Sequence, residues 1–390
     1  MSVSNGANLL VIHGGGPTSV INASLYGVIQ EARKHHAEIH GTYGAKGGVG
    51  GALKEEFIDF KQQSEEDIDR LLCTPASAIG TSRMELCKED YEELVQRLVK
   101  NKIKYLLFNG GNGSMDTCGK IYKIAQKHGI QVIGIPKTID NDIAVTDHSP
   151  GFGSAARYIA ASTAEVAEDV KSLPIHVSII EAMGRNSGWI TGASALARQK
   201  KGEAPHLIYL PERPFYEENF LADVKALYKK LGGVVVVASE GLKNKQGQSI
   251  VPPVFKKGRS IYFGDVSSYL ALLVIKKLGI KARSEKPGIL GRASIEYQSS
   301  VDREEAEMAG RYAVKAIVAG ETGKMVGFKR IAADIYQCEP ILIPLEDVMM
   351  YEKKVPDAFI NARGNDVNEE FLAYCRPLIG SDLPIFSNLK

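Results

Sequence analysis

The chain has 390 residues, 44% of them hydrophobic and 24% charged, which gives a soluble globular protein room for two hydrophobic cores. Its formal net charge of +2 gives no reason to expect a nucleic acid or an anionic membrane as a partner. It has no apolar run of membrane-spanning length, no signal-peptide pattern and no Cys-x-x-Cys pair among its five cysteines, so we expect a cytoplasmic protein with reduced thiols.

Five short apolar runs along the chain each lead into a glycine-rich or polar loop. The runs are residues 9–12, 105–108, 132–133, 177–180 and 234–237. Apolar residues then recur at helical spacing, for example over residues 20–32 and 115–122. Apolar strands that alternate with amphipathic helices predict an α/β fold with a parallel sheet covered on both faces. Ligands of such sheets bind beyond the carboxyl ends of the strands, which makes the five loops the candidate site.

The first two loops are rich in glycine, and each precedes a predicted helix. Residues 14–18 read Gly-Gly-Gly-Pro-Thr, and residues 110–114 read Gly-Gly-Asn-Gly-Ser. Exposed amides at a helix N-terminus bind phosphate, and glycine lets a ligand approach the backbone closely. A tight strand-to-helix turn without a ligand is the alternative for the first loop taken alone. Because two such loops follow parallel strands, we favour phosphate binding, with Ser114 as a helix cap or an anion ligand.

Residues 134–142, Gly-Ile-Pro-Lys-Thr-Ile-Asp-Asn-Asp, are the most informative stretch of the chain. They place a cation (Lys137), a hydroxyl (Thr138) and two carboxylates (Asp140 and Asp142) at the mouth of a predicted strand. This set suits transfer of a phosphoryl group to an alcohol. One carboxylate takes the alcohol's proton, the other helps to hold a metal, and the lysine meets phosphate charge. The alternative is a solvated polar turn, because turns also favour Asp and Asn.

Charged side chains at later strand ends complete the candidate set. Arg185 follows the fourth run and suits bidentate recognition of phosphate, with an ordinary surface residue as the alternative. Glu240 follows the fifth run and could bond a sugar hydroxyl or cap a loop. Arg283 and Arg292 form a second cationic cluster, or else a solvated basic face. The eight histidines show no metal-ligand spacing.

With these motifs in place, the chain resembles the phosphofructokinases across most of its length. The resemblance rests on residues 15–18 with 22–23, 80–83, 110–114, 136–142, 150–154, 181–188 and 239–241. Residues 136–138, Pro-Lys-Thr, and 150–154, Pro-Gly-Phe-Gly-Ser, look most like the branch that contains pyrophosphate-dependent enzymes. The resemblance implies a glycolytic enzyme that uses Mg2+ to phosphorylate the 1-hydroxyl of fructose 6-phosphate, giving fructose 1,6-bisphosphate.

The resemblance also implies an α/β fold of two Rossmann-like α/β/α domains with mainly parallel sheets and an active-site cleft between them. Residues 1–152 and about 290–340 would form the phosphoryl-donor domain. Residues 153–289 with 341–390 would form the sugar-phosphate domain. Because one arginine of the site can come from a neighbouring subunit in this family, we expect a homodimer or a homotetramer.

Each motif residue has a role that the resemblance implies. Asp140 would be the base that takes the proton of the sugar's 1-hydroxyl, Asp142 would assist through the metal or the local charge, and Thr138 would bond the transferred phosphoryl group. Lys137 would be a further catalytic cation. The donor would be bound by Gly15, Gly16, Arg83, Gly111, Asn112, Gly113 and Ser114. The sugar phosphate would be held by Thr138, Met183, Gly184, Arg185, Glu240, Arg283 and Arg292.

Three positions bear on the metal and on the choice of donor. Asn112 stands where the family usually has an acidic residue, so Asn112 and Asp142 would hold Mg2+ weakly. Gly113 leaves room for the α-phosphate of ATP, where pyrophosphate enzymes usually carry Asp, whereas Lys137 is typical of pyrophosphate users. A steric and charge block is a sharper specificity device than a tolerated lysine. We therefore expect ATP as the donor, with pyrophosphate as the alternative.

Other substrates and other classes stay open. In residues 290–292, Leu-Gly-Arg, the family commonly has Gln before the Arg, and His176 stands where an intersubunit Arg is frequent. Both departures leave room for a different phosphorylated ketose. A nucleotide-binding, catalytically weak regulatory subunit would explain Asn112 but not the intact Asp140 and Asp142. A dinucleotide oxidoreductase would need an acidic ribose-binding residue near residues 39–42, and the sequence has none there.

Overall fold

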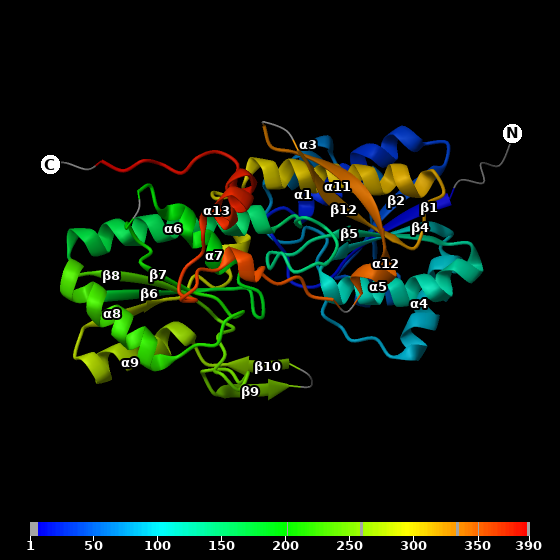
Figure 1. The fold of residues 1–390 in the computed structure, drawn as a ribbon. Coiled ribbons are helices and arrows are strands. Elements are labelled where there is room, and N and C mark those ends of the chain that lie inside the picture. Colours follow the sequence, from blue (N-terminus) through cyan, green and yellow to red (C-terminus); the bar gives the residue numbers. More distant parts are fainter. Residues whose placement is uncertain (1–6, 201, 258–259, 333–334, 350, 388–390) are drawn as a thin grey trace, which may run out of the picture. The chain divides into compact units, whose positions relative to one another are not determined.

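The computed structural model describes residues 7–387 apart from 201, 258–259, 333–334 and 350, and the chain divides into two compact units (Figure 1). Unit 1 contains Met1–Phe152 and Ala293–Lys353. Unit 2 contains Gly153–Arg292 and Lys354–Lys390. Each unit is therefore assembled from two separate stretches of the chain.

A seven-stranded sheet in the order β13-β12-β5-β4-β1-β2-β3 forms the centre of unit 1. Its strands are β1 Ala7–His13, β2 Ile39–Ala45, β3 Phe57–Asp59, β4 Ile103–Gly110, β5 Gln131–Pro136, β12 Lys324–Ile331 and β13 Gln337–Pro344. The inner strands are parallel, whereas β3 and β13 pair antiparallel with their neighbours. The carboxyl ends of β1, β4 and β5 therefore lie side by side at one end of the sheet.

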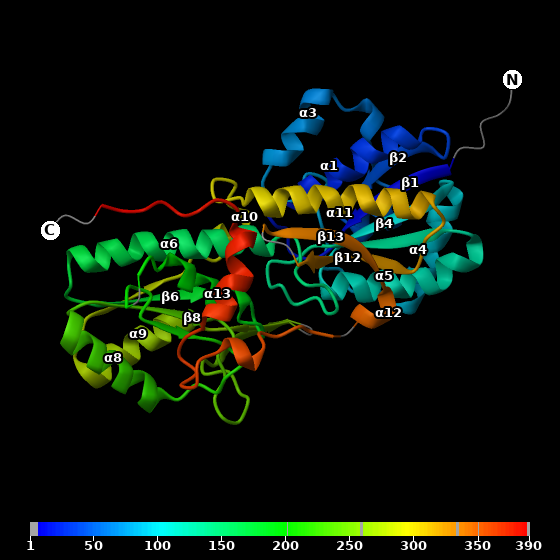
Figure 2. The same ribbon diagram turned by 45° about the horizontal axis from the view of Figure 1, so that its top comes forward.

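Helices cover both faces of this sheet because successive side chains of its strands point to opposite sides. They are α1 Ile21–Ala32, α2 Val49–Leu53, α3 Glu65–Arg70, α4 Lys88–Lys100, α5 Asn112–Ala125, α11 Ser300–Val318 and α12 Leu345–Val348. Leu9 and Val11 of β1 share a buried core with α1 and α11, whereas Leu10 and Ile12 share another with α4 and α5. Figure 2 shows α11 on one side of the strands and α4 and α5 on the other.

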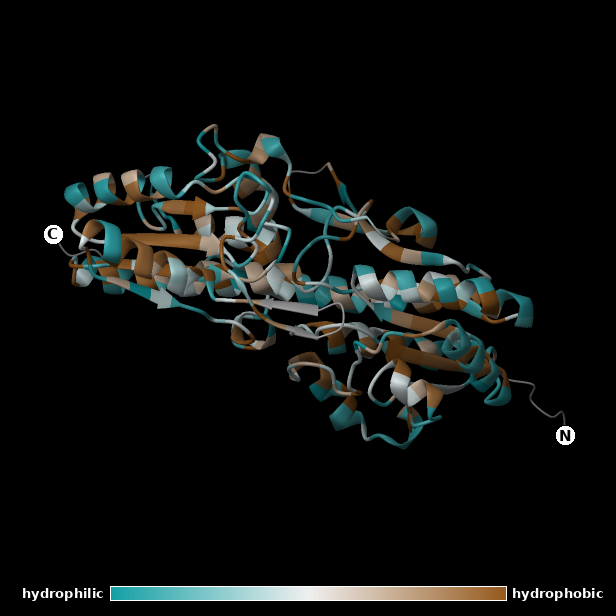
Figure 3. Cartoon of the chain, turned by 90° about the horizontal axis from the view of Figure 1, so that it is seen from below, coloured by the Kyte–Doolittle hydropathy of each residue, from teal (hydrophilic) through white to brown (hydrophobic). Residues whose placement is uncertain are grey.

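Unit 2 contains a smaller sheet of four parallel strands in the order β11-β6-β8-β7. Its strands are β6 Val177–Ala182, β7 Leu207–Tyr209, β8 Val234–Ser239 and β11 Ala282–Glu285, with a separate hairpin of β9 Pro253–Lys257 and β10 Ser260–Phe263. Its helices are α6 Phe152–Ser172, α7 Trp189–Ala193, α8 Glu217–Leu231, α9 Val266–Leu278, α10 Leu290–Ala293 and α13 Glu369–Cys375. Phe220 of α8 and Leu270 of α9 pack into one core with β6, β7 and β8, and the strands at the centre of the sheet are coloured mostly as hydrophobic in Figure 3.

The predicted α/β class with mainly parallel sheets is confirmed, and the five apolar runs lie in β1, β4, β5, β6 and β8. These strands divide between two sheets, so three of the candidate loops belong to unit 1 and two belong to unit 2. Residues 341–353, which the resemblance placed in the second domain, belong to unit 1 because β13 pairs with β12. The division of donor and sugar binding between the units stays a prediction. Within the described part of the chain, we find no helix that combines the length and the hydropathy of a membrane span.

Candidate active site

The loop after β1, residues 14–16, is held against a neighbouring segment by hydrogen bonds. The Gly15 N–H donates to the Ser82 carbonyl at 2.9 Å, and Thr81 Oγ1 donates to the Gly15 carbonyl at 2.8 Å. Gly15 has a φ of 79°, a conformation that favours glycine. These bonds place the exposed residue Arg83, one position beyond Ser82, next to the glycine loop.

The side chain of Ser114 lies against two of the glycines. A Cβ atom built on Gly14 would lie 2.5 Å from Ser114 Oγ, and one built on Gly110 would lie 2.1 Å from it. Both positions therefore need glycine so that the loops after β1 and β4 can approach each other. Because α5 begins at Asn112, its N-terminal amides lie at this same end of the sheet, where they suit an anionic ligand.

Lys137 extends from the end of β5 to the loop after β1. Its N–H donates to the Gly110 carbonyl at 3.0 Å, and its Nζ donates to the Gly16 carbonyl at 2.5 Å. The residue is only 3% exposed, so the glycine loops enclose the ammonium group. Burial and the nearby charge of Lys137 lower the pKa of His13 to about 3, which keeps the imidazole neutral. The positive charge at this end of β1 is therefore that of Lys137 and not of His13.

Asp142 is fixed by side chains from two of the loops. Thr138 Oγ1 donates to Asp142 Oδ1 at 3.1 Å, and Asn112 Nδ2 donates to Asp142 Oδ2 at 2.8 Å. The Asn112 Oδ1 atom is buried and has no hydrogen-bond partner among the described residues. Thr138 Oγ1 also accepts a bond from the Asp140 N–H at 3.1 Å. The loop after β5 thus presents both carboxylates at defined positions, with Asp140 half-buried.

Lys353, which no sequence motif nominates, contacts the loop after β5 through its Nζ atom. Its Nζ donates to the Asp147 carbonyl at 2.8 Å and to the Thr146 carbonyl at 3.1 Å. The lysine lies 207 residues beyond Thr146 in the chain. No local spacing could reveal the contact, because only the fold brings the two segments together.

A second unpredicted cluster surrounds Glu305 of α11. Its Oε2 lies 2.6 Å from His148 Nε2, and its Oε1 accepts hydrogen bonds from Tyr336 at 2.6 Å and from Cys338 at 2.9 Å. Burial acts to raise the pKa of Glu305, but these three partners lower it further than burial raises it. His148, Glu305 and Cys338 could together face a metal ion, yet sulfur and nitrogen atoms do not suit Mg2+. We interpret the cluster as a hydrogen-bonded network that ties the loop of His148 to α11.

In unit 2 the predicted sugar residues after β6 and β8 contact one another. Glu240 Oε1 accepts hydrogen bonds from the N–H groups of Gly184 and Arg185, each at 3.2 Å. Gly184 has a φ of 133° and Arg185 a φ of 49°, so the turn that follows Met183 adopts a conformation uncommon for side-chain-bearing residues. A Cβ atom on Gly241 would lie 1.5 Å from the Arg185 carbonyl oxygen, which shows how closely the two loops pack.

The two arginines predicted to bind the sugar phosphate lie on consecutive elements of unit 2. Arg283 is exposed on β11, and Arg292 is half-buried on α10. Burial, followed by the positive charges of Arg283 and Lys281, lowers the pKa of His176. His176 is therefore a neutral neighbour of Arg283 and not a replacement for a cationic residue.

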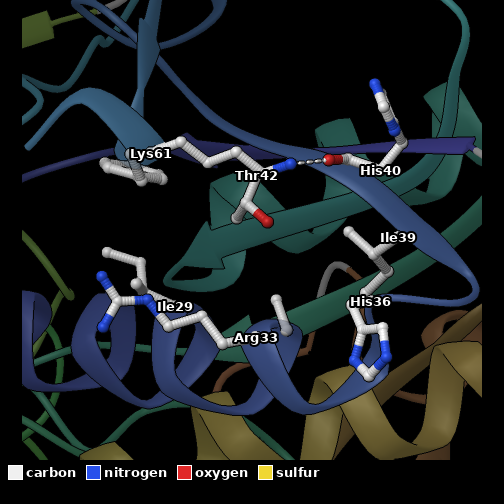
Figure 4. A pocket seen from close by; sticks show the side chains of 9 residues that line it. Ile29, Arg33, His36, Ile39, His40, Thr42 and Lys61 are labelled. Carbon is white, nitrogen blue, oxygen red and sulfur yellow. Dashed lines mark hydrogen bonds between the residues drawn. The ribbon is translucent and has the colours of Figure 1, made fainter.

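Unit 1 also contains a separate cavity at the start of β2 (Figure 4). Because β2 runs parallel to β1, this cavity lies at the opposite end of the seven-stranded sheet from the loops after β1, β4 and β5. Its lining comes from the end of α1, the start of β2 and the segment after β3, including Arg33, His36 and Thr42. Lys61 donates a hydrogen bond across it to the His40 carbonyl. The cavity contains none of the residues that the sequence motifs nominate.

The structure thus brings most nominated residues together within their own unit. In unit 1 they are Gly15, Gly16, Arg83, Gly111, Asn112, Ser114, Lys137, Thr138, Asp140 and Asp142. Gly113 is exposed on the first turn of α5, and a Cβ atom there would meet nothing within 4 Å. In unit 2 the nominated residues are Met183, Gly184, Arg185 and Glu240, with Arg283 and Arg292 on β11 and α10. Their catalytic and binding roles stay predictions.

Comparison with known proteins defines the class. Residues 8–317 match the Phosphofructokinase family, so the chain belongs to the phosphofructokinase family. A pyrophosphate–fructose 6-phosphate 1-phosphotransferase of Rhodospirillum rubrum is 37% identical over 96% of this chain and 95% of its own. The crystal structure of a pyrophosphate-dependent phosphofructokinase from Marinobacter aquaeolei is 39% identical, with a TM-score of 0.88 over 98% of this chain and 94% of its own. A sulfofructose kinase of Alkalicoccus urumqiensis is 34% identical over 90% of this chain and 91% of its own.

Proposed function

We propose that this protein transfers a phosphoryl group from pyrophosphate to the 1-hydroxyl of fructose 6-phosphate. The proposal rests on relatives whose names state this activity. These relatives are 36–38% identical to this protein over nearly the whole chain. The sequence alone predicts ATP as the donor, with pyrophosphate as the alternative. The relatives favour pyrophosphate, so we adopt it as the donor.

The loop chemistry accounts for the reaction in one balanced step. The Asp140 carboxylate accepts the proton of the 1-hydroxyl, and the hydroxyl oxygen forms a bond to one phosphorus of pyrophosphate. The bond from that phosphorus to the bridging oxygen breaks, and its electron pair leaves with orthophosphate. The products are fructose 1,6-bisphosphate and phosphate. Lys137 and the amides of the glycine loops stabilise the negative charge of the donor.

The contrast between Lys137 and Gly113 supports the change of donor. Lys137 is buried and bonded to the Gly16 carbonyl, so its ammonium group is built into the loops that would hold the donor phosphates. Gly113 lies at an exposed and open position. Open space at Gly113 admits the α-phosphate of ATP but does not require it. The buried ammonium group of Lys137 therefore indicates the donor better than the open space at Gly113 does.

Mg2+ fits the oxygen atoms of Asn112 and Asp142. The Asn112 Oδ1 atom is buried without a hydrogen-bond partner among the described residues, and carbonyl and carboxylate oxygens are the ligands that this ion prefers. When bound, Mg2+ supplies positive charge against the phosphates of the donor. Because Asn112 lacks the charge of an acidic residue, the ion would be held more weakly than by two carboxylates.

A paired assay tests the proposal. Purified protein is incubated with fructose 6-phosphate and Mg2+ and either pyrophosphate or ATP, and fructose 1,6-bisphosphate is measured with aldolase as the coupling enzyme. We expect kcat/KM with pyrophosphate to exceed that with ATP at least ~10-fold, because Lys137 is built into the loops that would hold the donor phosphates and a charge-assisted hydrogen bond contributes about 1.5–3 kcal/mol. Faster turnover with ATP would contradict the proposal and would support ATP as the donor, as the sequence alone predicts.

The sugar is the second variable of the same assay. The sulfofructose kinase relative and the departures at residues 290–292 and His176 together motivate sulfofructose as a second candidate acceptor. Replacing fructose 6-phosphate by sulfofructose under the same conditions separates the two acceptors by their kcat/KM values.

We also infer a homodimeric or homotetrameric enzyme that works in the cytoplasm as part of glycolysis. The inference is supported by the family resemblance, in which site arginines are shared between subunits. Analytical ultracentrifugation of the purified chain measures the oligomeric state, and a monomer at micromolar concentration would contradict it.

A further inference from the structure

The loop between β5 and α6 carries the proposed base but has little regular structure of its own. Asn141, which separates Asp140 from Asp142, is fully buried and has a φ of 52°. This left-handed conformation is uncommon for a residue with a side chain, so surrounding contacts must maintain it. The Asn141 Oδ1 atom accepts a hydrogen bond from the Ser149 N–H at 3.1 Å, which closes the loop on itself.

Lys353 binds this loop at several points at once. Its Nζ lies 2.8 Å from the Asp147 carbonyl oxygen, 3.1 Å from that of Thr146 and 3.4 Å from Asn141 Oδ1. An ammonium group has three donors, and here it meets three oxygen atoms of one loop. Its backbone N–H donates in addition to the Asp142 carbonyl at 2.8 Å. The lysine therefore contacts the loop on both sides of the Asp142 carboxylate.

Three charged residues surround the side chain of Lys353. Burial lowers the pKa of Lys353, Asp147 and Asp142 oppose that effect, and Arg330 adds to it. Together these effects lower the pKa of Lys353 to about 7, and the Nζ atom can donate hydrogen bonds both as an ammonium and as an amine. A neutral apolar side chain would leave the Thr146 and Asp147 carbonyls and the Asn141 amide without this donor. The loss of a hydrogen-bond donor from polar groups shielded from water lowers the stability of the folded loop.

We propose that Lys353 is a positioning residue for phosphoryl transfer, which holds the loop in the conformation that places Asp140 and Asp142. The inference rests on the proposed function, because it concerns the base of that reaction. Lys353 is also the last residue of unit 1, after which the chain continues into unit 2 at Lys354. The contacts of Lys353 therefore join the loop that carries Asp140 to the last residue of unit 1.

The test compares Lys353→Met, Lys353→Arg and the control Lys329→Met, an exposed lysine on β12. Displacing catalytic groups by about an ångström costs up to ~100-fold in rate, so we expect Lys353→Met to lower kcat about 10- to 100-fold. The KM values for fructose 6-phosphate and pyrophosphate should change less than about threefold, because the substrate-binding groups are retained. Lys353→Arg should recover most of kcat, and Lys329→Met should match the unaltered enzyme.

Hydrogen exchange of the peptide over residues 138–151 separates this inference from the proposed function. Lys353→Met should exchange faster there than the unaltered protein. The unaltered protein could prove inactive with both donors and fructose 6-phosphate while the variant still exchanges faster. That result would reject the proposed function but keep the role of Lys353 in holding the loop. Unchanged kcat in Lys353→Met, or no recovery in Lys353→Arg, overturns the positioning role. If Lys353→Met does not fold, Lys353→Gln, which can still donate to a carbonyl, takes its place with the same criteria.

Discussion

At the scale of single residues, the loop after β5 presents two carboxylates, those of Asp140 and Asp142. Asp142 accepts hydrogen bonds from Thr138 and Asn112, so its oxygen atoms are held in place and suited to a metal or to charge stabilisation. Asp140 is half-buried, and its backbone N–H is fixed by Thr138 Oγ1. The fixed oxygen atoms of Asp142 suit the metal or charge role, which agrees with the proposal of Asp140 as the base.

Replacement of the base tests that assignment. We expect Asp140→Asn to lower kcat by ~10²- to 10⁴-fold, because an amide cannot accept the proton that a placed carboxylate accepts. The melting temperature should stay within a few degrees of the unaltered protein. Asp116→Asn on α5, which removes an exposed ion pair with Lys120, is the matched control. A variant of Asp140 with near-normal turnover would reject the assigned base.

Lys137 offers a test of donor binding. Its ammonium group is enclosed by the glycine loops and bonded to the Gly16 carbonyl. Charge-assisted hydrogen bonds contribute about 1.5–3 kcal/mol, so Lys137→Met should lower kcat/KM for pyrophosphate roughly 10- to 100-fold. Initial rates over a range of pyrophosphate concentrations measure this, with Lys120→Met as the control. Equal kcat/KM values for the two variants would exclude Lys137 from the donor site.

Gly113 tests the reinterpretation of the donor preference. Because a Cβ atom there meets nothing within 4 Å, Gly113→Asp should fold normally. The added carboxylate should lower any ATP turnover through like-charge repulsion, while kcat/KM for pyrophosphate stays within about threefold. Loss of pyrophosphate turnover together with ATP turnover would mean that the space beside Gly113 belongs to the shared part of the donor site.

At the scale of elements, α1 and α11 pack so closely that two glycines are needed. A Cβ atom on Gly27 of α1 would lie 2.2 Å from the Glu307 carbonyl oxygen, and one on Gly310 of α11 would lie 2.0 Å from that of Ser24. The glycines lie in helix interiors, where they are unfavourable for the isolated helix. Their presence is explained by the approach of the two backbones and not by local propensity.

This close contact predicts a difference between two Gly-to-Ala substitutions. Gly310→Ala forces the helices apart, and overpacking typically costs about 1–3 kcal/mol of unfolding free energy. Gly113→Ala on α5 adds a methyl group to open space and should leave stability unchanged or raise it by about 0.5–1 kcal/mol. Urea unfolding followed by circular dichroism measures both, and a Gly310→Ala protein as stable as Gly113→Ala would contradict the packing argument.

At the scale of the whole molecule, the buried His13 makes stability depend on pH. Its pKa is about 3 in the folded protein and about 6.5 when unfolded. Below pH 6.5 the unfolded chain therefore binds a proton that the folded chain does not, and the unfolding free energy falls as the pH decreases towards 3. Above pH 6.5 the group contributes no pH dependence.

The substitution His13→Asn removes the titrating group while keeping a side chain that can bond Ser77, which His13 Nδ1 contacts at 2.8 Å. Between pH 7 and 4.5 we expect the unaltered protein to lose about 2–3 kcal/mol more unfolding free energy than this variant. Urea midpoints at the two pH values measure the difference. Parallel declines for the two proteins would show that His13 titrates normally.

How much of the fold was predictable follows from which interactions are local. The apolar runs and the glycine loops after them identified β1, β4, β5, β6 and β8 and the class of the fold, because hydrophobic pattern and turn chemistry act over a few residues. Strand β13 escaped notice because it lies at an edge of the sheet and is mostly exposed or half-buried, and β12 because it is buried only over residues 325–328. The division of the five loops between two sheets was implied by the family resemblance and not by the apolar pattern, since strand order depends on long-range pairing.

The sequence by itself determined the class of fold, the glycine-rich loops and the loop of the two carboxylates, since each loop is a short segment whose residue types act over a few positions. Only the tertiary structure decided that Lys137 is enclosed by the loop after β1, that Asn112 bonds Asp142, and that Lys353 holds the carboxylate loop. These contacts join segments far apart in the chain. Their geometry is set by packing of the sheet and its helices, which no local pattern specifies.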